Sequence, residues 1–317
     1  MALQKTLRLV PQVKEVVWGG NWLQENLNRS AKKGALLGES WEAYSASVVF
    51  EGEFADRTLE SLWKEFGVKL FGEKSEKYPA FPLLAKFIDA RQNLSIQVHP
   101  NNELAQKLEN YPYGKTEFWY VLEATPNAEI IYGLKENVSH ETLKISLQKG
   151  DILEHCRKVS VQKGDIVFIP AGTVHALTEG VVVYELQQNC DITYRLYDWG
   201  RVGREIHLKK GLEVISFADS SLAITQPDWQ ENITDFRNAT LAKCEYFESL
   251  ILEIRSAMPL SSPKESFAIL SIIEGEAEIP SENLHLKTGD TLLLPAGFST
   301  SLRSISETCT LILSYLC

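Results

Sequence analysis

The chain has 317 residues, of which 44% are hydrophobic and 23% charged, so one large domain or two smaller ones can bury a substantial core. The net charge of −10 argues against a protein that binds nucleic acid or anionic membranes, because both partners require a basic surface. This charge does not exclude a small phosphorylated substrate, since a few well-placed basic side chains are enough for one phosphate.

The cysteines and the N-terminal segment indicate the compartment. The five cysteines are scattered and form no C-x-x-C pair, which favours a reducing environment over a disulfide framework. The first twenty residues lack the continuous apolar core of a signal peptide, and no apolar run is long enough to span a bilayer. We therefore expect a cytoplasmic protein.

Helical patterns are few and short. Residues 57–72 place four apolar side chains at helical spacing and predict a surface helix. Residues 101–110 begin with a capping Asn and predict a second helix, and the segment VSHETLKISLQKG predicts a third.

Most of the remaining chain has the pattern of β-strands. The segment FPLLAKFIDARQNLSIQVHP predicts two strands joined by a polar turn at 90–93. The runs EFWYVLEA, AEIIYGL, DIVFIPA and VVVYELQQ predict further strands, separated by Gly, Pro and Asn. Strands predominate, which is typical of a sandwich or barrel.

One hairpin pattern occurs twice. Residues 163–175 read KGDIVFIPAGTVH and residues 288–300 read TGDTLLLPAGFST, with Gly-Asp and Pro-Ala-Gly at the same spacing. The first copy ends at His175 and the second at Thr300, so we expect only the first copy to keep a metal ligand.

The repeat indicates two related domains. We predict a catalytic, metal-binding domain over residues 1–235 and a C-terminal barrel without metal ligands over 240–317. The least periodic stretch, 217–240, is polar and is interpreted as the linker. The fold class is mainly β with a few peripheral helices.

Four side chains form a candidate metal site. Strand alternation places Gln97 and His99 on one face, and Glu117 and His175 stand at the ends of two other predicted strands. Two imidazoles, a carboxylate and an amide oxygen suit a divalent metal with an open position. A single histidine in such a setting is more often a hydrogen-bonded structural residue, but two matching motifs favour a metal.

Two basic residues accompany these candidates. Lys115 shares the strand face of Glu117; the alternative is a solvated lysine in a turn. Arg195 lies between tyrosines in TYRLYDW, where a guanidinium needs a carboxylate or a phosphate; the alternative is an ion pair with a nearby Asp that supports the fold. We assign no role to the remaining histidines, which are His140, His155, His207 and His285.

These motifs together resemble a known family. The pattern G-x5-P-x-G-x2-H that ends at His175 resembles the second motif of the cupin superfamily, and Gln97-x-His99 stands where the first motif has His-x-His. With GKTEFWYVLEA and ELQQNCDITYRLYDWGR, residues 1–210 look like the short bacterial form of type I mannose-6-phosphate isomerase. The resemblance is weaker beyond these residues.

The resemblance implies a fold and an activity. The fold would be two cupin-like (jelly-roll) β-barrels, and the activity would interconvert mannose 6-phosphate and fructose 6-phosphate by proton transfer through an enediol. One Zn²⁺ per chain would be held by the family ligands, which match Gln97, His99, Glu117 and His175.

The resemblance also implies catalytic residues. Arg195 matches the active-site arginine of the family, and Lys115 matches a lysine proposed as a catalytic group. Lys86 matches a lysine to which we give no role. The proton-transfer base is the least defined assignment, because Lys115 would have to lose its charge to act as a base.

Two alternatives remain open. A metal-dependent cupin dioxygenase would also use two histidines and a carboxylate, although Gln97 and the basic residues argue against it. A non-catalytic sugar-binding cupin would bind the same ligand without turnover.

Overall fold

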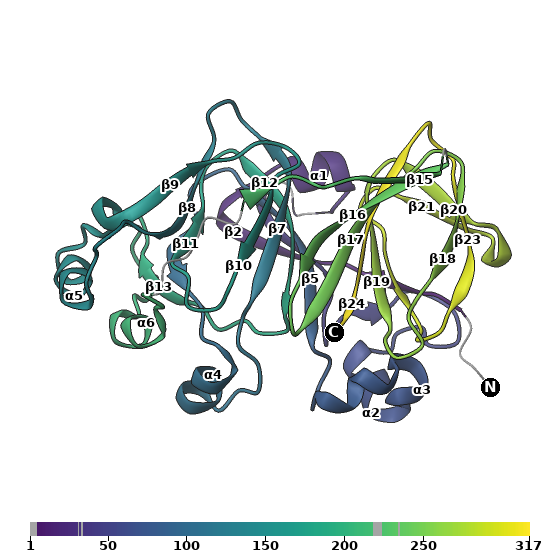
Figure 1. Cartoon of the computed structure of the whole chain (residues 1–317), viewed down its shortest axis with the longest axis horizontal. Helices are drawn as coiled ribbons and strands as arrows, with labels where there is room; N and C mark the ends of the chain where they lie inside the picture. The colour runs from purple at the N-terminus through teal and green to yellow at the C-terminus, as the bar shows by residue number, and fades with distance from the viewer. Residues whose placement is uncertain (1–4, 31, 33, 218–223, 234) are drawn as a thin grey trace.

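The computed structural model describes residues 5–30, 32, 34–217, 224–233 and 235–317. Its strands form four antiparallel sheets and its helices are short and peripheral (Figure 1), so the prediction of a mainly β protein is confirmed. None of the described helices is long and apolar enough to cross a membrane.

Two facing sheets make up the N-terminal half. The seven-stranded sheet has the order β14 (Ile224–Thr225), β10 (Ile166–Ile169), β7 (Glu117–Ala124), β12 (Val181–Gln188), β5 (Leu83–Ala90), β3 (Leu37–Ala43) and β2 (Gln12–Gly20). The five-stranded sheet has the order β13 (Tyr194–Tyr197), β6 (Ile96–Val98), β11 (His175–Leu177), β8 (Glu129–Leu134) and β9 (Cys156–Ser160). A buried apolar cluster that includes Trp119, Val121 and Ile130 fills part of the space between them.

Two further sheets make up the C-terminal half. The eight-stranded sheet has the order β15 (Gln230–Ile233), β16 (Phe236–Lys243), β17 (Phe247–Ile254), β24 (Cys309–Leu316), β19 (Ala268–Glu274), β22 (Thr291–Leu294), β1 (Leu7–Val10) and β4 (Val48–Val49). The four-stranded sheet has the order β18 (Ala257–Ser261), β23 (Ser299–Ser304), β20 (Glu276–Ile279) and β21 (Leu284–Lys287). Because β1 and β4 belong to the eight-stranded sheet, the first fifty residues contribute to both halves.

The helices cover outer surfaces. The α-helices are α1 (Trp22–Leu27), α2 (Leu59–Phe66), α3 (Val68–Phe71), α4 (Asn102–Glu109), α5 (His140–Lys149) and α6 (Leu208–Val214), and the 3₁₀ helices are η1 (Glu73–Lys77), η2 (Ile152–His155) and η3 (Pro280–Glu282). Helices α4, α5 and α6 pack on the outer face of the five-stranded sheet (Figure 1), where they share a buried cluster with β6, β11 and β13.

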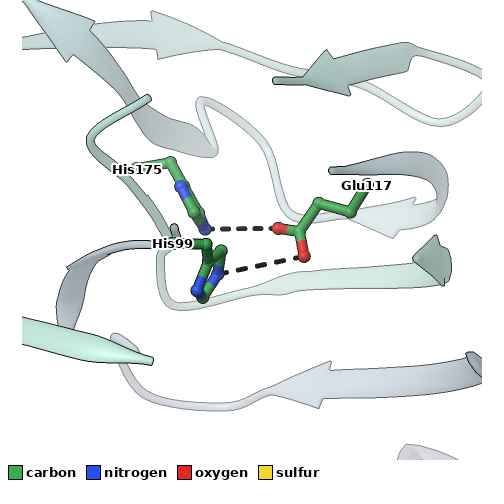
Figure 2. A group of neighbouring side chains, drawn as sticks. All are labelled: His99, Glu117 and His175. Carbon is green, nitrogen blue, oxygen red and sulfur yellow. Dashed lines mark ion pairs between the residues drawn. The ribbon is translucent and has the colours of Figure 1, made fainter. Parts of the chain in front are cut away.

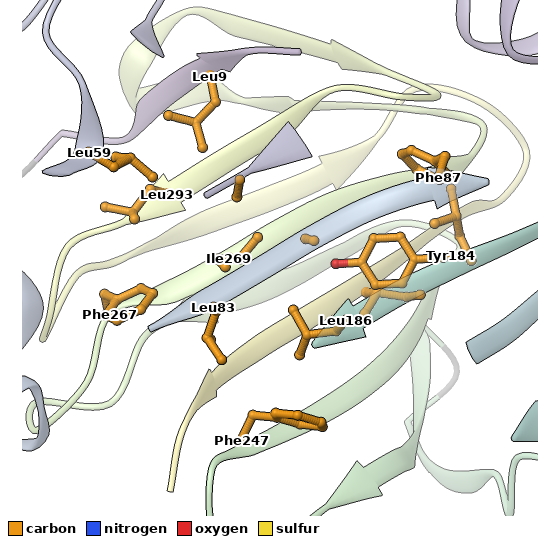
Figure 3. Packing of buried hydrophobic residues seen from close by; sticks show 14 of the residues in the cluster. Leu9, Leu59, Leu83, Phe87, Tyr184, Leu186, Phe247, Phe267, Ile269 and Leu293 are labelled. Atoms are coloured by element: carbon orange, nitrogen blue, oxygen red, sulfur yellow. The ribbon is translucent and has the colours of Figure 1, made fainter. Parts of the chain in front are cut away.

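The two halves are joined by one large apolar core. The seven-stranded and eight-stranded sheets contribute side chains to the same buried cluster, which contains Tyr184 and Leu186 from one sheet and Phe247 and Ile269 from the other (Figure 3). A polar contact supports the same junction, since Arg29 pairs with the buried carboxylate of Glu42 at 2.9 Å and donates to the carbonyl of Gly289 at 2.6 Å.

The predicted helices are present, with one difference. The helix predicted over 57–72 is capped by Thr58, whose hydroxyl accepts from the Ser61 amide, but it is split into α2 and α3. Gly67 separates them because its φ of 46° leaves the helical region. Helices α4 and α5 confirm the other two predictions.

The predicted strands are also present, but their pairing was not foreseen. The two strands predicted around the turn at 90–93 are β5 and β6, and they belong to different sheets. The chain therefore crosses from one sheet to the other at this point. That crossing brings the face of Gln97 and His99 toward the strands of the seven-stranded sheet.

The repeated hairpin is confirmed. Gly164 and Gly289 have φ values of 92° and 90°, and each opens a turn that leads into a strand, β10 in the first copy and β22 in the second. Both strands end at Pro-Ala-Gly, with Gly172 and Gly297 again at positive φ. The two copies thus use the same backbone path.

The predicted linker is only partly irregular. Residues 217–240 contain β14, β15 and the start of β16, while 218–223 and 234 lie outside the described residues. Strand β14 pairs with β10 of the N-terminal half, and β15 pairs with β16 of the C-terminal half. The domain division at 235–240 stays a prediction.

The apolar core between the halves gives a stability prediction. The Phe267 ring is 0% exposed and contacts the rings of Trp63, Phe71 and Phe81. Phe267→Ala should lower the free energy of unfolding by about 3–5 kcal/mol, because ring burial is lost and a cavity remains. The urea midpoint measures this change. Phe50→Ala is the control, since Phe50 is 58% exposed; equal midpoints for the two variants would contradict the prediction.

Candidate metal centre

Three metal-ligand side chains converge at one end of the N-terminal half. The ligand atoms of His99, Glu117 and His175 all lie within 4.8 Å of one another, and the three residues are at most 1% exposed (Figure 2). His175 Nε2 lies 3.2 Å from Glu117 Oε1, and His99 Nε2 lies 3.9 Å from Glu117 Oε2. Within the described residues, no other group of three His, Cys, Asp or Glu side chains meets in this way.

Both facing sheets contribute to the cluster. Glu117 is the first residue of β7 in the seven-stranded sheet, and His175 is the first residue of β11 in the five-stranded sheet. Gln97 is the direct cross-strand partner of His175, and its amide nitrogen lies 3.3 Å from His175 Nε2. A half-turn of this amide would present its oxygen at the same point. The four sequence candidates therefore lie together.

The two imidazoles are oriented by backbone carbonyls. His99 Nδ1 lies 3.0 Å from the carbonyl of Ile192, and His175 Nδ1 lies 2.9 Å from the carbonyl of Thr173. A carbonyl can only accept, so each Nδ1 carries the proton and each Nε2 presents its lone pair toward Glu117. Burial, together with Lys115, lowers the pKa of His99 well below its usual value. The neutral imidazole that a metal requires is thus favoured.

The donor set fits a divalent metal. Both carboxylate oxygens of Glu117 are buried and accept no conventional hydrogen bond. Burial alone would raise the pKa of Glu117, but Lys115 and the two histidines outweigh it and hold this pKa well below its usual value. Tetrahedral ligands at about 2.1 Å from a metal lie about 3.4 Å apart, and the observed separations of 3.2 and 3.9 Å are close to that spacing.

Lys115 is part of the cluster. Its side chain is 5% exposed, and its Nζ lies 3.0 Å from Glu117 Oε2 and 3.1 Å from His99 Nε2. The alternative of a solvated lysine in a turn is therefore wrong. The strand alternation that placed Lys115 on the face of Glu117 was the informative signal.

A row of alternating charges extends from Lys115 across the seven-stranded sheet. Lys115 Nζ lies 3.8 Å from Glu185, whose carboxylate lies 3.0 Å from Lys86 Nζ, which in turn lies 3.5 Å from Glu39. Trp119 Nε1 donates to the second oxygen of Glu185 at 2.7 Å. Glu185 and Glu39 raise the pKa of Lys86 against the effect of burial, so Lys86 is a buried cation.

Sequence reasoning missed Glu185. A single carboxylate in the apolar run VVVYELQQ was the available signal, because such a charge is costly to bury without a partner. Glu185 is 2% exposed, and its Oε1 makes no hydrogen bond beyond its ion pairs. Burial, with the nearby charge of Glu117, raises the pKa of Glu185.

Arg195 lines a cavity next to the cluster. It is the cross-strand partner of Gln97, and both line a cavity of about 310 Å³ together with Lys86, Lys115 and Glu185. Among the described residues, Arg195 forms no ion pair, since Asp198 pairs with Arg201 and Arg204 instead. The alternative of an Arg195–Asp ion pair is therefore wrong.

His207, to which the sequence assigned no role, also lines this cavity. Its Nδ1 accepts a hydrogen bond from the backbone amide of Arg195 at 3.1 Å, and its own amide donates to the Arg195 carbonyl at 2.7 Å. Twelve residues separate the two positions, so local sequence patterns did not indicate this contact.

The second copy of the hairpin has no comparable site. Thr300 occupies the position that corresponds to His175, and its hydroxyl is hydrogen-bonded to Ser281 on the surface. The expectation that this copy keeps no metal ligand stays a prediction.

Comparisons with known proteins identify relatives of the chain. Residues 6–123 match the family "Phosphomannose isomerase type I, catalytic domain", and residues 237–316 match "Mannose-6-phosphate isomerase, cupin domain". The chain is 40% identical to the mannose-6-phosphate isomerase ManA of Bacillus subtilis over 90% of this chain and 92% of that protein. It is 33% identical to the mannose-6-phosphate isomerase of Streptococcus mutans over 92% of this chain and 93% of that protein.

A solved structure shows the same fold over the whole chain. The crystal structure of a mannose 6-phosphate isomerase from Bacillus subtilis superposes with a TM-score of 0.87 at 32% identity, covering 98% of this chain and 99% of that chain.

Removal of one imidazole tests the metal centre. His175→Ala should reduce the bound metal from about one ion per chain to a small fraction, because one of the few protein ligands is lost. Metal analysis after gel filtration measures this, and His140→Ala is the matched control because His140 is exposed on α5.

A chelator should lower the melting temperature of the wild type but not of His175→Ala. Equal metal content in wild type and His175→Ala would show that the ion binds elsewhere.

Proposed function

The chain belongs to the type I phosphomannose isomerase family, and we propose that it is a zinc-dependent mannose-6-phosphate isomerase that interconverts mannose 6-phosphate and fructose 6-phosphate. The observation that carries the proposal is the buried His99–Glu117–His175 cluster beside a cavity lined by its neighbours Gln97 and Lys115 and by Arg195, which forms no ion pair among the described residues. The relatives bearing this activity in their names cover nearly the whole chain.

We also propose the finer features that the family suggests. The two halves would be cupin-like (jelly-roll) barrels, divided at residues 235–240, which is supported by the repeated hairpin and by the match to a cupin domain. The cysteine usage supports a cytoplasmic location.

Zinc is the proposed metal because of the ligand types. Two imidazole nitrogens, one carboxylate and the amide of Gln97 are ligands that zinc accepts in catalytic sites with an open position. When bound, the ion would polarise the oxygens on C1 and C2 of the open-chain sugar and favour the charge that develops on them.

Lys115 and Arg195 supply positive charge. Lys115 Nζ lies 3.0 Å from Glu117 Oε2 and 3.8 Å from Glu185 Oε1, and its side chain lines the cavity, where it would donate a hydrogen bond to a sugar oxygen. Arg195 projects from β13 at the position opposite Gln97 and would stabilise the phosphate or the enediolate.

Glu185 is the proposed proton-transfer base. It is a buried carboxylate on the wall of the cavity, and Lys86, Trp119 and Lys115 hold it in place. In the forward direction it would accept the proton from C2 and return it to C1, while the hydroxyl proton on C2 moves to the oxygen on C1. A raised pKa brings such a carboxyl closer to the working pH, which favours reversible transfer.

A coupled assay tests the function. The purified protein should form fructose 6-phosphate from mannose 6-phosphate, lose this activity after chelation and regain it with Zn²⁺, because the ligand set requires a metal. Oxygen uptake in place of isomerisation would indicate the dioxygenase alternative. Binding of mannose 6-phosphate without turnover in the metal-loaded protein would indicate a sugar-binding cupin.

Glu185→Gln tests the base. This variant should lower kcat by about 10²- to 10⁴-fold and slow the exchange of the substrate C2 proton with deuterium from solvent, since the amide cannot accept a proton. Metal content and melting temperature should remain close to the wild type. Glu141→Gln is the control because the Glu141 side chain is 70% exposed. Turnover of Glu185→Gln within threefold of the wild type would exclude Glu185 as the base.

A further inference from the structure

The charges in the cavity are distributed unevenly. The cavity is lined by four cations, two lysines and two arginines, which are Lys86, Lys115, Arg195 and Arg204. The lysines have carboxylate partners in the cavity wall, because Lys86 pairs with Glu39 and both lysines lie within 4.0 Å of Glu185. At the arginine end, Asp198 pairs with Arg204 from outside the cavity lining, Asp191 lines the cavity without an ion pair to either arginine, and Arg195 forms no ion pair among the described residues.

The loop between β13 and α6 holds the two arginines. At its base the His207 amide donates to the Arg195 carbonyl and the Arg195 amide donates to His207 Nδ1, and the carbonyl of Glu205 accepts from Arg195 Nη1 at 2.9 Å. Farther along the loop, Asp198 is 2% exposed and accepts from Arg204 Nη1 at 3.0 and 3.2 Å. The protein thereby fixes one nitrogen of each guanidinium.

The other guanidinium donors are free to bind a ligand. Arg195 Nε is buried without a hydrogen-bond partner, and Arg204 Nε and Nη2 have none among the described residues. Arg201 differs from both, because it donates to the carbonyls of Asn93 and Asp198 and does not line the cavity. Two arginines that line one cavity and keep free donors favour a phosphate, which accepts several charge-assisted hydrogen bonds.

The strand order separates the arginine end of the cavity from the His99–Glu117–His175 cluster. Arg195 pairs with Gln97, and Gln97 pairs with His175, so the arginine strand is two strands from the histidine strand. Adjacent strands lie about 4.8 Å apart, which places the two backbones about 10 Å from each other. A hexose 6-phosphate carries its phosphate at the far end of the sugar from C1, so the two ends of the substrate match the two ends of the cavity.

We propose that Arg204, with Arg195, binds the phosphate of the substrate and makes the enzyme specific for phosphorylated sugars. This inference rests on the proposed function, since it names the residue that recognises one end of that substrate. Asp198 fixes one nitrogen of the Arg204 guanidinium, and Arg204 lines the cavity; Arg195 provides donors from β13.

Arg204→Ala tests the inference. The variant should raise the KM for mannose 6-phosphate and the Kd for inorganic phosphate, measured by calorimetry, by about 10- to 100-fold each, because charge-assisted hydrogen bonds are lost. The kcat and the metal content should change little. Arg204→Lys should recover part of the loss, since it keeps the charge without the planar guanidinium. Asp198 stays paired with Arg201 in both variants, so its charge remains compensated.

A control variant and two distinct outcomes decide between the inference and the proposed function. Lys209→Ala removes the same charge from an exposed position on α6 and should leave both constants unchanged. If the KM and the phosphate Kd of Arg204→Ala stay within twofold of the wild type, the inference is wrong. If the wild type does not isomerise mannose 6-phosphate at all, the proposed function fails, and the phosphate Kd alone then decides the role of Arg204.

Discussion

The structure depends on the compensation of one buried charge, the carboxylate of Glu117. A carboxylate removed from solvent is costly in a protein interior unless charges compensate it, and Glu117 is 0% exposed. Lys115 and two imidazoles surround it. The two imidazoles and the carboxylate form a group of ligand types that suits a divalent cation, while Lys115 compensates the charge of Glu117.

The sandwich of two sheets makes this arrangement possible. The seven-stranded sheet supplies Glu117 and the alternating row that ends at Glu39, whereas the five-stranded sheet supplies Gln97 and His175. Neither sheet contains a complete ligand set. A large apolar core packs the seven-stranded sheet against the C-terminal half. The C-terminal half therefore supports the sheet that contains Glu117, Glu185 and Glu39.

The cavity divides its charges between two tasks. Near the metal-ligand candidates, Lys86 and Lys115 are paired with Glu185, and Lys86 is also paired with Glu39. At the arginine end, Arg195 and Arg204 keep free donors because the loop fixes each of them through only one nitrogen. A negatively charged chain can thus bind an anionic sugar at one preorganised place.

The sequence by itself determined the strands, the repeated hairpin, the four ligand candidates and the face shared by Lys115 and Glu117, because alternation along a strand fixes which side chains lie together. It could not determine that β5 and β6 belong to different sheets, or that Glu185 and His207 enter the cavity. Those features depend on pairing between strands distant in the chain. Alternation along a strand predicts on which face of the sheet a side chain lies. Only the tertiary structure decides which other side chains it contacts.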